Sequence, residues 1–338
     1  MPDRLTDRFP EMSQAELIAQ LVPPPIFDGA TFDSYHPVPG EPTQVEAVKV
    51  AKEFVNKIGS IHKGQRKWGM GKRTRGTGAG IYLDGGFGVG KTHLLASAFR
   101  EAPEPKSFGT FVELTHTVGA LGYMKAVEEF KDHSLLCIDE FELDDPGDTM
   151  LISRLLTELS AQGVSIAVTS NTLPHQLGEG RFAAADFMRE IKKLGDIFQS
   201  IRVDGPDYRH RDLPPAPKPA TTVELKKRAA ETPGATLDDW DSLCAHLTQL
   251  HPSRYLHLID GVSTVFISDI KPVTDQGMAL RIVVLADRLY DASIPVVASG
   301  TPLDKIFPKE MLEGGYRKKY LRAISRLLAL SRRGNTAV

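Results

Sequence analysis

The chain has 338 residues, of which 41% are hydrophobic and 25% are charged. These values are close to the averages for soluble globular proteins, and the length is enough for roughly two domains of about 150 residues. Because 41 Lys and Arg residues stand against 43 Asp and Glu residues, the formal net charge is −2. This balance excludes a chain-wide electrostatic attraction to nucleic acid or anionic membranes, while local basic patches stay open.

The cysteine content, the hydropathy and the N-terminal residues indicate the expected compartment. The two cysteines, Cys137 and Cys244, exclude a disulfide framework and argue against a zinc site built from cysteines. No apolar run reaches the roughly 18 residues that span a bilayer, so we expect no transmembrane segment. The acidic N-terminus is typical of neither a secretory signal nor an Arg-rich transit peptide, which predicts a cytoplasmic protein.

The first part of the chain alternates proline-rich and helical patterns. Residues 1–43 contain many prolines, which predicts an extended N-terminal arm with a short helix over 14–21. Apolar residues at three- and four-residue spacing predict a helix over 44–58. Residues 57–80 carry seven Lys or Arg residues and no acidic residue. Such a run is more often a solvated loop than a binding patch, and both interpretations stay open.

From residue 81 onward, short apolar strands alternate with helical patterns. This alternation predicts an α/β fold, a P-loop-type core over 44–211 whose parallel sheet is covered by helices on both faces. The proline-rich, charged stretch 212–237 is typical of an exposed linker or insertion, and 238–338 are expected to form a C-terminal α/β segment that completes the module. The expected strands are Ile81–Leu83, Thr110–Leu114, Ser134–Ile138, Val164–Thr169, Ser200–Val203, Val262–Ile267 and Ile294–Ala298.

The C-terminal segment partly echoes the core. A shift of 129 residues lays Ser263–Ile267 over Ser134–Ile138 and Val297–Ser299 over Val168–Ser170 without a gap. The polar residues that follow each strand are not shared. The match fits a degenerate duplicate that kept its core and lost its chemistry. It also fits two unrelated strand–helix–strand units of similar length, which the small number of identities slightly favours.

One segment fits the phosphate-binding pattern Gly-x-x-x-x-Gly-Lys-[Ser/Thr]. It follows an apolar strand and opens a helical run, which is the context that such a loop requires. Its glycines let backbone N–H groups wrap phosphates, and the helix N-terminus adds its positive dipole end. Lys91 is expected to reach the β- and γ-phosphates of ATP, and the Thr92 hydroxyl to bind Mg²⁺. The expected nucleotide-binding residues are Gly85, Gly86, Phe87, Gly88, Val89, Gly90, Lys91 and Thr92.

Two acidic residues, Asp139 and Glu140, come directly after a buried apolar strand. Ligands bind at the carboxyl edge of parallel sheets, so Asp139 is expected to hold Mg²⁺ together with Thr92. Glu140 is then placed to orient and polarise the attacking water as general base, which favours a hydrolase over a transferase. Asp148 is expected to cap the next helix. The intervening acids are expected to be solvated: Glu142, Asp144 and Asp145.

Asn171 follows the next strand, where its amide can reach the γ-phosphate and the water. We interpret it as a sensor of the γ-phosphate, the alternative being a turn-forming Asn. Hydrolases of this type often need an arginine from a neighbouring subunit, which would imply a homo-oligomer. Arg181 is the preferred candidate and Arg189 the second, with surface salt bridges as the alternative for both. Arg322 and Arg326 share one helix face, which either folds back onto the nucleotide or is a solvated basic face.

Longer strings narrow the class further. The phosphate-binding loop, Cys137–Phe141 and Thr169–Asn171 resemble those of AAA-type P-loop ATPases. Over roughly residues 27–330 the chain resembles the ZapE cell-division ATPase family. The strings that carry this resemblance are Ile138–Asp145, Asp148–Leu156, Asp207–Arg211, Ala286–Asp291 and Ser325–Leu327.

This resemblance implies an ATPase that acts on a protein partner. The bacterial family is associated with the tubulin-like ring protein FtsZ at the inner face of the membrane. FtsZ is therefore the expected client, and the expected location is the cytoplasm, peripheral at the inner membrane or division site. The resemblance carries the nucleotide roles onto residues 85–92, Asp139, Glu140 and Asn171. The family's Gly-Leu-Gln-Arg-like string is replaced here by Gly178–Phe182.

Two other functions share the same core. A nucleic-acid-linked ATPase such as a helicase loader would use the basic run between Lys57 and Arg75. A GTP switch would need an Asn-Lys-x-Asp string to recognise guanine, and Asn56-Lys57-Ile58-Gly59 lacks the Asp. The sequence therefore favours ATP, with a nucleic-acid partner as the alternative.

Overall fold

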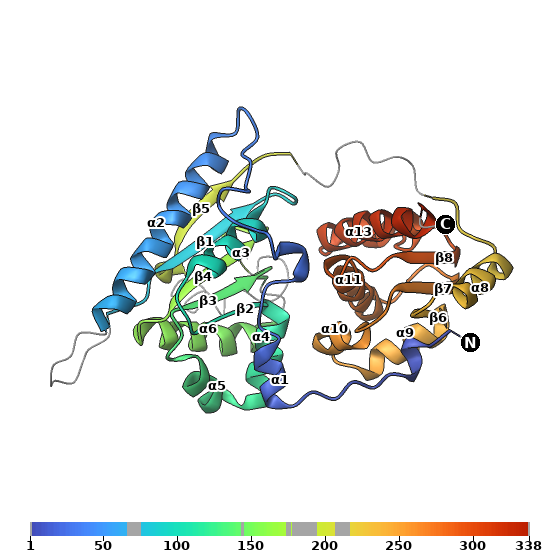
Figure 1. Ribbon diagram of the computed structural model, residues 1–338, viewed down its shortest axis with the longest axis horizontal. Helices are drawn as coiled ribbons and strands as arrows, with labels where there is room; N and C mark the ends of the chain where they lie inside the picture. The colour runs from blue at the N-terminus through green and yellow to red at the C-terminus, as the bar shows by residue number, and fades with distance from the viewer. Residues whose placement is uncertain are drawn as a thin grey trace. The chain divides into compact units, whose positions relative to one another are not determined.

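The computed structural model describes residues 2–65, 76–142, 145–173, 177, 195–206 and 217–336, which form two compact units (Figure 1). The five-stranded unit contains residues 13–23 and the chain from Phe27 through the fifth strand. Its strands stand in the order β2-β3-β4-β1-β5, and every neighbouring pair is parallel. They are β1 (Gly80–Gly85), β2 (Lys106–Thr110), β3 (Leu135–Asp139), β4 (Ser165–Ser170) and β5 (Gln199–Val203).

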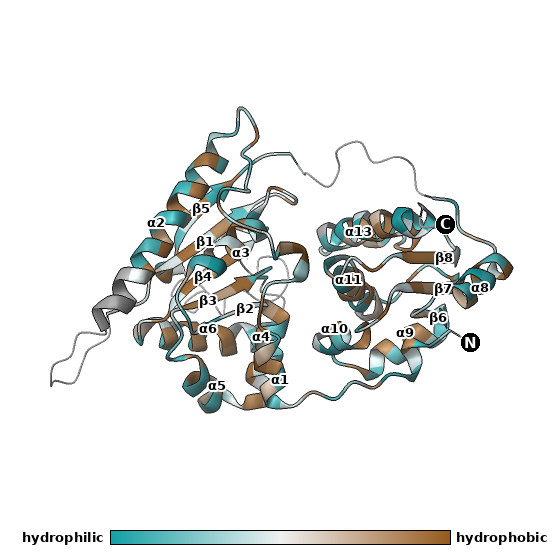
Figure 2. Ribbon diagram, in the orientation of Figure 1, coloured by the Kyte–Doolittle hydropathy of each residue, from teal (hydrophilic) through white to brown (hydrophobic). Residues whose placement is uncertain are grey.

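Helices cover both faces of this sheet, as the sequence predicts. Side chains alternate along a strand, so neighbours in β1 enter different cores. Ile81 and Leu83 pack with α2 and α3, whereas Tyr82 between them packs with α4 and α6. The strands are correspondingly apolar in Figure 2. The helices are α1 (Gln14–Ala19), α2 (Pro42–Gln65), α3 (Lys91–Glu101), α4 (Phe111–Leu121), α5 (Tyr123–Phe130) and α6 (Pro146–Ala161).

The strand expected over Thr110–Leu114 is wrong, because β2 ends at Thr110 and α4 begins at Phe111. A capping box fixes this boundary. The Thr110 hydroxyl accepts the Glu113 N–H at 3.3 Å, and the Glu113 carboxylate accepts the Thr110 N–H at 2.7 Å. The Thr-x-x-Glu spacing is a helix-start signal that outweighs the strand preference of the β-branched and aromatic residues between them.

The expected cap of α6 is also wrong. Asp145, not Asp148, accepts the N–H three residues on at 3.0 Å, and Asp148 lies in the first turn of the helix. Pro146 occupies the first helical position, where its missing N–H costs nothing. Asp145 is therefore a capping residue rather than merely a solvated acid.

The three-stranded unit contains residues 2–12, 24–26 and the chain from Pro217 onward. Its strands β6 (Ala235–Asp239), β7 (Thr264–Ile270) and β8 (Val296–Gly300) are parallel and adjacent in that order. One core lies between the sheet and α9, α11 and α13, and a smaller one lies under α8. The helices are α8 (Thr222–Glu231), α9 (Trp240–Gln249), α10 (Tyr255–Leu258), α11 (Gln276–Asp291), α12 (Lys309–Leu312) and α13 (Arg317–Thr336).

Of the two alternatives for 212–237, an exposed linker or an insertion, the exposed linker is wrong from Thr222 on, because α8 and most of β6 lie there. The Thr221 hydroxyl accepts the Glu224 N–H at 3.2 Å and starts α8. Leu225 and Ala229, four residues apart on one helix face, are buried against Phe266 of β7. The prediction of a linker rested on the proline and charge content. It did not take into account the helix cap at Thr221 or the apolar pair Leu225 and Ala229.

The N-terminal arm is divided between the units. Residues 13–23 belong to the five-stranded unit, whereas residues 2–12 add to the edge of the other sheet through a parallel bridge between Asp3 and Thr236. Leu5 is fully buried in the larger core of the three-stranded unit. The buried Asp238 carboxylate accepts the Leu5 N–H at 3.0 Å and the Thr6 hydroxyl at 2.8 Å. The beginning of the chain is thus a structural part of its C-terminal unit.

The two units repeat one order of elements. Strands β2, β3 and β4 lie side by side in parallel, as do β6, β7 and β8, and helices of 16 residues, α6 and α11, join the last two strands of each series. Glu140 after β3 and Asp269 in β7 both have left-handed φ, 55° and 58°. Each donates its N–H at 3.0 Å to a hydroxyl of the next strand, Thr169 or Ser299. The left-handed residues correspond under the shift of 129 residues, but the accepting hydroxyls do not, because the shift lays Ala298 rather than Ser299 over Thr169; the duplication therefore stays a prediction.

Candidate functional site

The loop over residues 85–92 joins β1 to α3 at the carboxyl edge of the five-stranded sheet. A Cβ at Gly85 would lie 2.0 Å from the Val203 carbonyl oxygen. Gly90 has a φ of 89°, and a Cβ there would lie 2.4 Å from the ring of Tyr35. Backbone alone fits at both positions, so the loop can present its N–H groups to a phosphate.

Tyr35 holds this loop from the N-terminal arm. Its hydroxyl donates to the Val89 carbonyl oxygen at 2.7 Å, and its ring meets that of His93 edge-on at 5.6 Å. The sequence analysis did not identify Tyr35, because an isolated aromatic residue in a proline-rich arm carries no motif. The contact therefore ties the loop to the N-terminal arm.

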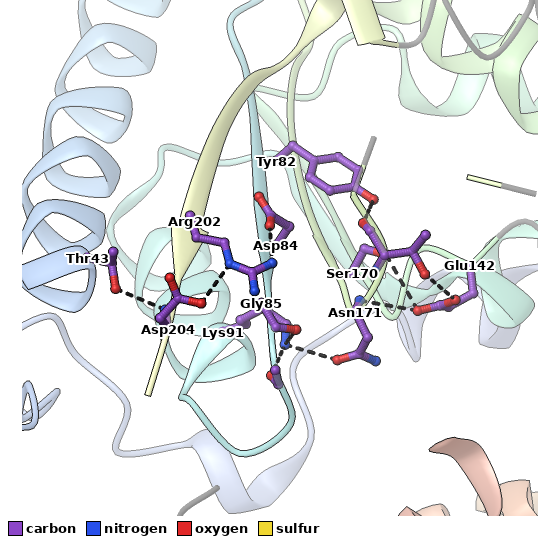
Figure 3. Close-up of polar contacts among 12 residues, drawn as sticks. Thr43, Tyr82, Asp84, Gly85, Lys91, Glu142, Ser170, Asn171, Arg202 and Asp204 are labelled. Carbon is purple, nitrogen blue, oxygen red and sulfur yellow. Dashed lines mark hydrogen bonds and ion pairs between the residues drawn. The ribbon is translucent and has the colours of Figure 1, made fainter. Parts of the chain in front are cut away.

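Lys91 points back into the loop it follows (Figure 3). Its Nζ donates to the Gly85 carbonyl at 3.0 Å, the Gly86 carbonyl at 2.5 Å and the Asn171 Oδ1 at 3.0 Å. The residue is only 8% exposed. A buried ammonium group surrounded by backbone is suited to an anionic ligand, and the contact with Asn171 brings two predicted site residues together.

Thr92 and Asp139 also meet. The Thr92 hydroxyl donates to both oxygens of the Asp139 carboxylate, at 3.1 and 3.2 Å, and the Thr169 hydroxyl donates to the same carboxylate. Burial, together with the charge of Glu140, raises the pKa of Asp139 to about 6 despite these hydrogen bonds. A buried carboxylate beside a second acid is a place where a bound cation would be strongly stabilising.

Mg²⁺ fits these donors. Within the described ranges, no group of three or more His, Cys, Asp and Glu side chains could hold a metal by itself. The protein's share of a magnesium site would therefore be the oxygens of Asp139 and Thr92, completed by phosphate oxygens and water. Such an all-oxygen, partly protein set is what Mg²⁺ prefers.

Glu140 follows Asp139 at the same sheet edge. Its φ of 55° turns the chain sharply out of β3, and its N–H donates to the Thr169 hydroxyl at 3.0 Å. A non-glycine residue in this region is uncommon and is maintained only where its surroundings fix it.

Glu142 is not solvated, contrary to the sequence-based expectation. It is 7% exposed, and its carboxylate accepts the Asn171 N–H at 3.2 Å and the Thr172 hydroxyl at 3.3 Å. The prediction that Glu142 is solvated rested on the acidic residues around it, which are typical of a surface loop. Asp144 lies outside the described residues.

An ion pair on the other side of the loop was also missed. Asp84, the residue before Gly85, is buried, and Arg202 of β5 donates to it at 2.8 Å and to Asp204 at 2.7 Å (Figure 3). These carboxylates raise the pKa of Arg202. The pair ties the edge strand to the start of the loop, and only the β1–β5 pairing makes it visible.

The arginine predictions have different outcomes. Arg181 and Arg189, as well as residues 66–75 of the basic run, lie outside the described residues. Arg322 and Arg326 do not form a solvated basic face: Arg322 is 7% exposed and donates to Asp287 at 2.7 Å, and Arg326 forms an ion pair with the same carboxylate. Their spacing of four residues places both guanidinium groups over one residue of α11.

P-loop nucleotide hydrolases are the class of protein in which a parallel α/β sheet carries such a loop, a buried Lys within it and an acidic residue after a neighbouring strand. This chain is one of them. Within that class it belongs to the AFG1-like ATPase family, whose sequence profile matches residues 11–221 and 213–336. The protein is therefore an ATPase.

Individual relatives confirm the resemblance to ZapE. Cell division protein ZapE of Escherichia coli K12 is 27% identical over 306 residues, covering 77% of this chain and 80% of that protein. An uncharacterized Schizosaccharomyces pombe protein is 27% identical over 282 residues, covering 68% and 62%. Lactation elevated protein 1 homolog B of Danio rerio is 25% identical over 227 residues, covering 56% and 44%.

Solved structures resemble the chain more distantly. DnaI aligns with a TM-score of 0.43 at 18% identity, covering 55% of this chain and 94% of its own. A similarity this low carries no functional information. Among the described helices, none is long and apolar enough to cross a membrane.

Proposed function

We propose that the protein hydrolyses ATP in a Mg²⁺-dependent reaction and uses the energy to remodel a protein partner. The observation that carries the proposal is the convergence of four polar side chains at one sheet edge: Lys91 contacts Asn171, and Thr92 contacts Asp139. Lys91 and Asn171 would then face the terminal phosphate, while Thr92 and Asp139 hold the cation. These residues come from α3, which follows β1, and from the ends of β3 and β4, so the site depends on the pairing of the three adjacent strands β3, β4 and β1.

Each residue has a defined task in this proposal. Lys91 exchanges its contacts with the Gly85 and Gly86 carbonyls for phosphate oxygens when ATP binds. Glu140 accepts a proton from the attacking water, and the Asn171 amide orients that water relative to the γ-phosphate. Bound Mg²⁺ would neutralise charge on the phosphate oxygens. Arg181, contributed by a neighbouring copy in a homo-oligomer, would stabilise transition-state charge.

The proposed client is FtsZ. Two facts support it: the family assignment, and the similarity to an Escherichia coli protein that is itself named a cell-division protein. The association of that family with FtsZ, stated with the resemblance above, supplies the particular partner. It also supplies the proposed location, in the cytoplasm and peripherally at the inner membrane or division site.

The test is ATP turnover by the purified full chain at micromolar concentration, with and without FtsZ filaments. Lys91→Ala is the blank, and Glu140→Gln is expected to bind ATP yet hydrolyse it at least about 100-fold more slowly, the usual contribution of a general base. Stimulation by filaments that vanishes in the blank supports the proposal. Hydrolysis by Glu140→Gln at the wild-type rate would overturn the assigned mechanism.

The client is tested separately from the chemistry. Turnover that ignores FtsZ but rises with single-stranded DNA or RNA, and loses that response when Arg66, Lys67, Lys72, Arg73 and Arg75 are neutralised, would overturn the FtsZ proposal. Because phosphate contacts release counterions, such a response must also weaken steeply with salt.

A further inference from the structure

The last residue of β4 and the two residues after it bond to one carboxylate. Glu142 accepts the Ser170 hydroxyl at 3.5 Å, the Asn171 N–H at 3.2 Å and the Thr172 hydroxyl at 3.3 Å (Figure 3). Three consecutive residues are therefore bound to one side chain that comes from another strand's end. Glu142 itself lies two residues after Glu140, so it connects the two loops that border the proposed reaction centre.

A second contact, from a residue of β1, holds the same segment. The Tyr82 hydroxyl donates to the Thr172 carbonyl at 2.7 Å, and burial raises the pKa of Tyr82, which keeps the hydroxyl a donor. Tyr82 lies in β1, the strand that leads into the phosphate-binding loop. The Asn171 backbone is thus held between the element before the loop and the segment after β3.

This arrangement decides where the Asn171 side chain can reach. Its Oδ1 is 3.0 Å from the Lys91 Nζ, while its own N–H is 3.2 Å from the Glu142 carboxylate. A short side chain such as Asn can move its amide only as far as its backbone allows. Buried carboxylates are costly unless they are hydrogen-bonded, and this one accepts from the Ser170 hydroxyl, the Asn171 N–H and the Thr172 hydroxyl. A carboxylate here is therefore suited to rigid positioning.

We propose that Glu142 is a positioning residue for ATP hydrolysis, which holds the Asn171 amide at the γ-phosphate and attacking water without touching either. The inference rests on the sensor role proposed for Asn171. The three bonds of Glu142 given above go to the end of β4 and the two residues after it, whereas nucleotide binding depends on the loop over residues 85–92. Loss of Glu142 consequently lowers kcat and leaves ATP affinity close to wild type.

The experiment is a double-mutant cycle in the full chain. Asn171→Ala, Glu142→Ala and the double variant are compared for kcat, for KM and for the affinity of a fluorescent ATP analogue. Asn171→Ala is expected to lose about 100-fold in kcat, the scale for one transition-state hydrogen-bond donor, and Glu142→Ala about tenfold, because misplacement costs less than removal. The double variant should be no slower than Asn171→Ala, since residues acting through one group are not additive.

Two further variants separate positioning from folding. Glu142→Gln keeps an acceptor for the Asn171 N–H and is expected to recover most of kcat, even where Glu142→Ala folds poorly. Thr172→Val removes one donor at nearly constant volume and should lower kcat about two- to threefold, on the scale of one modest hydrogen bond. Glu158→Ala is the matched control: its carboxylate accepts the Tyr123 hydroxyl at 2.7 Å, and its loss should leave kcat unchanged.

Each outcome decides one statement. A wild-type kcat in Asn171→Ala would overturn the proposed sensor role of Asn171 itself. A slow Asn171→Ala with a wild-type kcat in Glu142→Ala, or with fully additive losses in the double variant, overturns only the positioning role. A parallel loss of analogue affinity and kcat in both Glu142→Ala and Glu142→Gln also overturns it, because the carboxylate would then be shaping the binding loop.

Discussion

The ion-paired cluster in the three-stranded unit gives a stability prediction whose size follows from burial. Asp287 of α11 pairs with Arg322 and Arg326 of α13, and the three side chains are 6–12% exposed. Removing one member of a buried ion pair costs about 3–5 kcal/mol, because the remaining charge has lost a desolvated partner. We expect Asp287→Asn to lower the free energy of unfolding of this unit by about 4 kcal/mol.

An exposed pair in the same unit is the matched control. Asp241 and Lys271 also form an ion pair, but their side chains are 67% and 61% exposed. Exposed pairs contribute about 0–1 kcal/mol, because water screens the charges and both side chains lose freedom. Asp241→Asn should therefore leave the stability almost unchanged, although it removes the same charge.

Urea unfolding followed by tryptophan fluorescence can isolate the unit. The chain has two tryptophans, and Trp240 is buried in the core of the three-stranded unit, so a Trp68→Phe background makes Trp240 the reporter. With an m-value of about 2 kcal/mol per molar, the Asp287→Asn midpoint should fall by about 2 M and that of Asp241→Asn by less than about 0.5 M. Equal shifts for the two variants would refute the argument from burial.

Three smaller perturbations test the arm and the loop. Leu5→Ala should destabilise the three-stranded unit by about 3 kcal/mol in the same assay, because Leu5 is fully buried, whereas Phe9→Ala, 59% exposed, should change it by less than about 0.5 kcal/mol. Gly90→Ala should weaken ATP-analogue binding far more than Gly86→Ala, because a Cβ meets a ring at 2.4 Å in the first case and nothing closer than 3.9 Å in the second. Tyr35→Phe should cost about 1–3 kcal/mol through an unsatisfied buried carbonyl and raise KM for ATP.

Each contrary result would contradict one particular statement about the arm or the loop. If Leu5→Ala and Phe9→Ala behaved alike, the first residues would not belong to the folded C-terminal unit. Equal binding by the two glycine variants would mean that the loop can relax away from Tyr35. A Tyr35→Phe chain with unchanged stability and KM would remove the arm from any role at the loop.

Local sequence was sufficient for the fold class and for the loop that joins β1 to α3. The loop residues are contiguous, and the glycines, Lys91 and Thr92 are constrained by a single turn. Their pattern can therefore be recognised from the sequence without knowledge of the tertiary structure. Asp139 and Asn171 were located by the rule that the carboxyl ends of parallel strands share one edge, and the structure places both there. Their catalytic roles stay predictions.

The predicted boundaries of elements were wrong where two local sequence signals compete. The stretch from Thr110 to Leu114 has both strand-favouring residues and a capping box, and the box determined the outcome. Residues 212–237 contain prolines and charges that resemble a linker, yet Leu225 and Ala229 find an apolar partner in Phe266, which is far away in sequence. Composition cannot show whether such a partner exists.

Tertiary structure alone decided the remaining features, because each depends on residues that are distant in the chain. Leu5 and Asp238 are separated by 233 positions, and Asp84 and Arg202 by 118. Glu142 has the composition of a surface acid and becomes a buried acceptor only because β3 and β4 end beside each other. A sequence pattern records which chemistry a residue carries, whereas strand pairing determines which groups that chemistry meets.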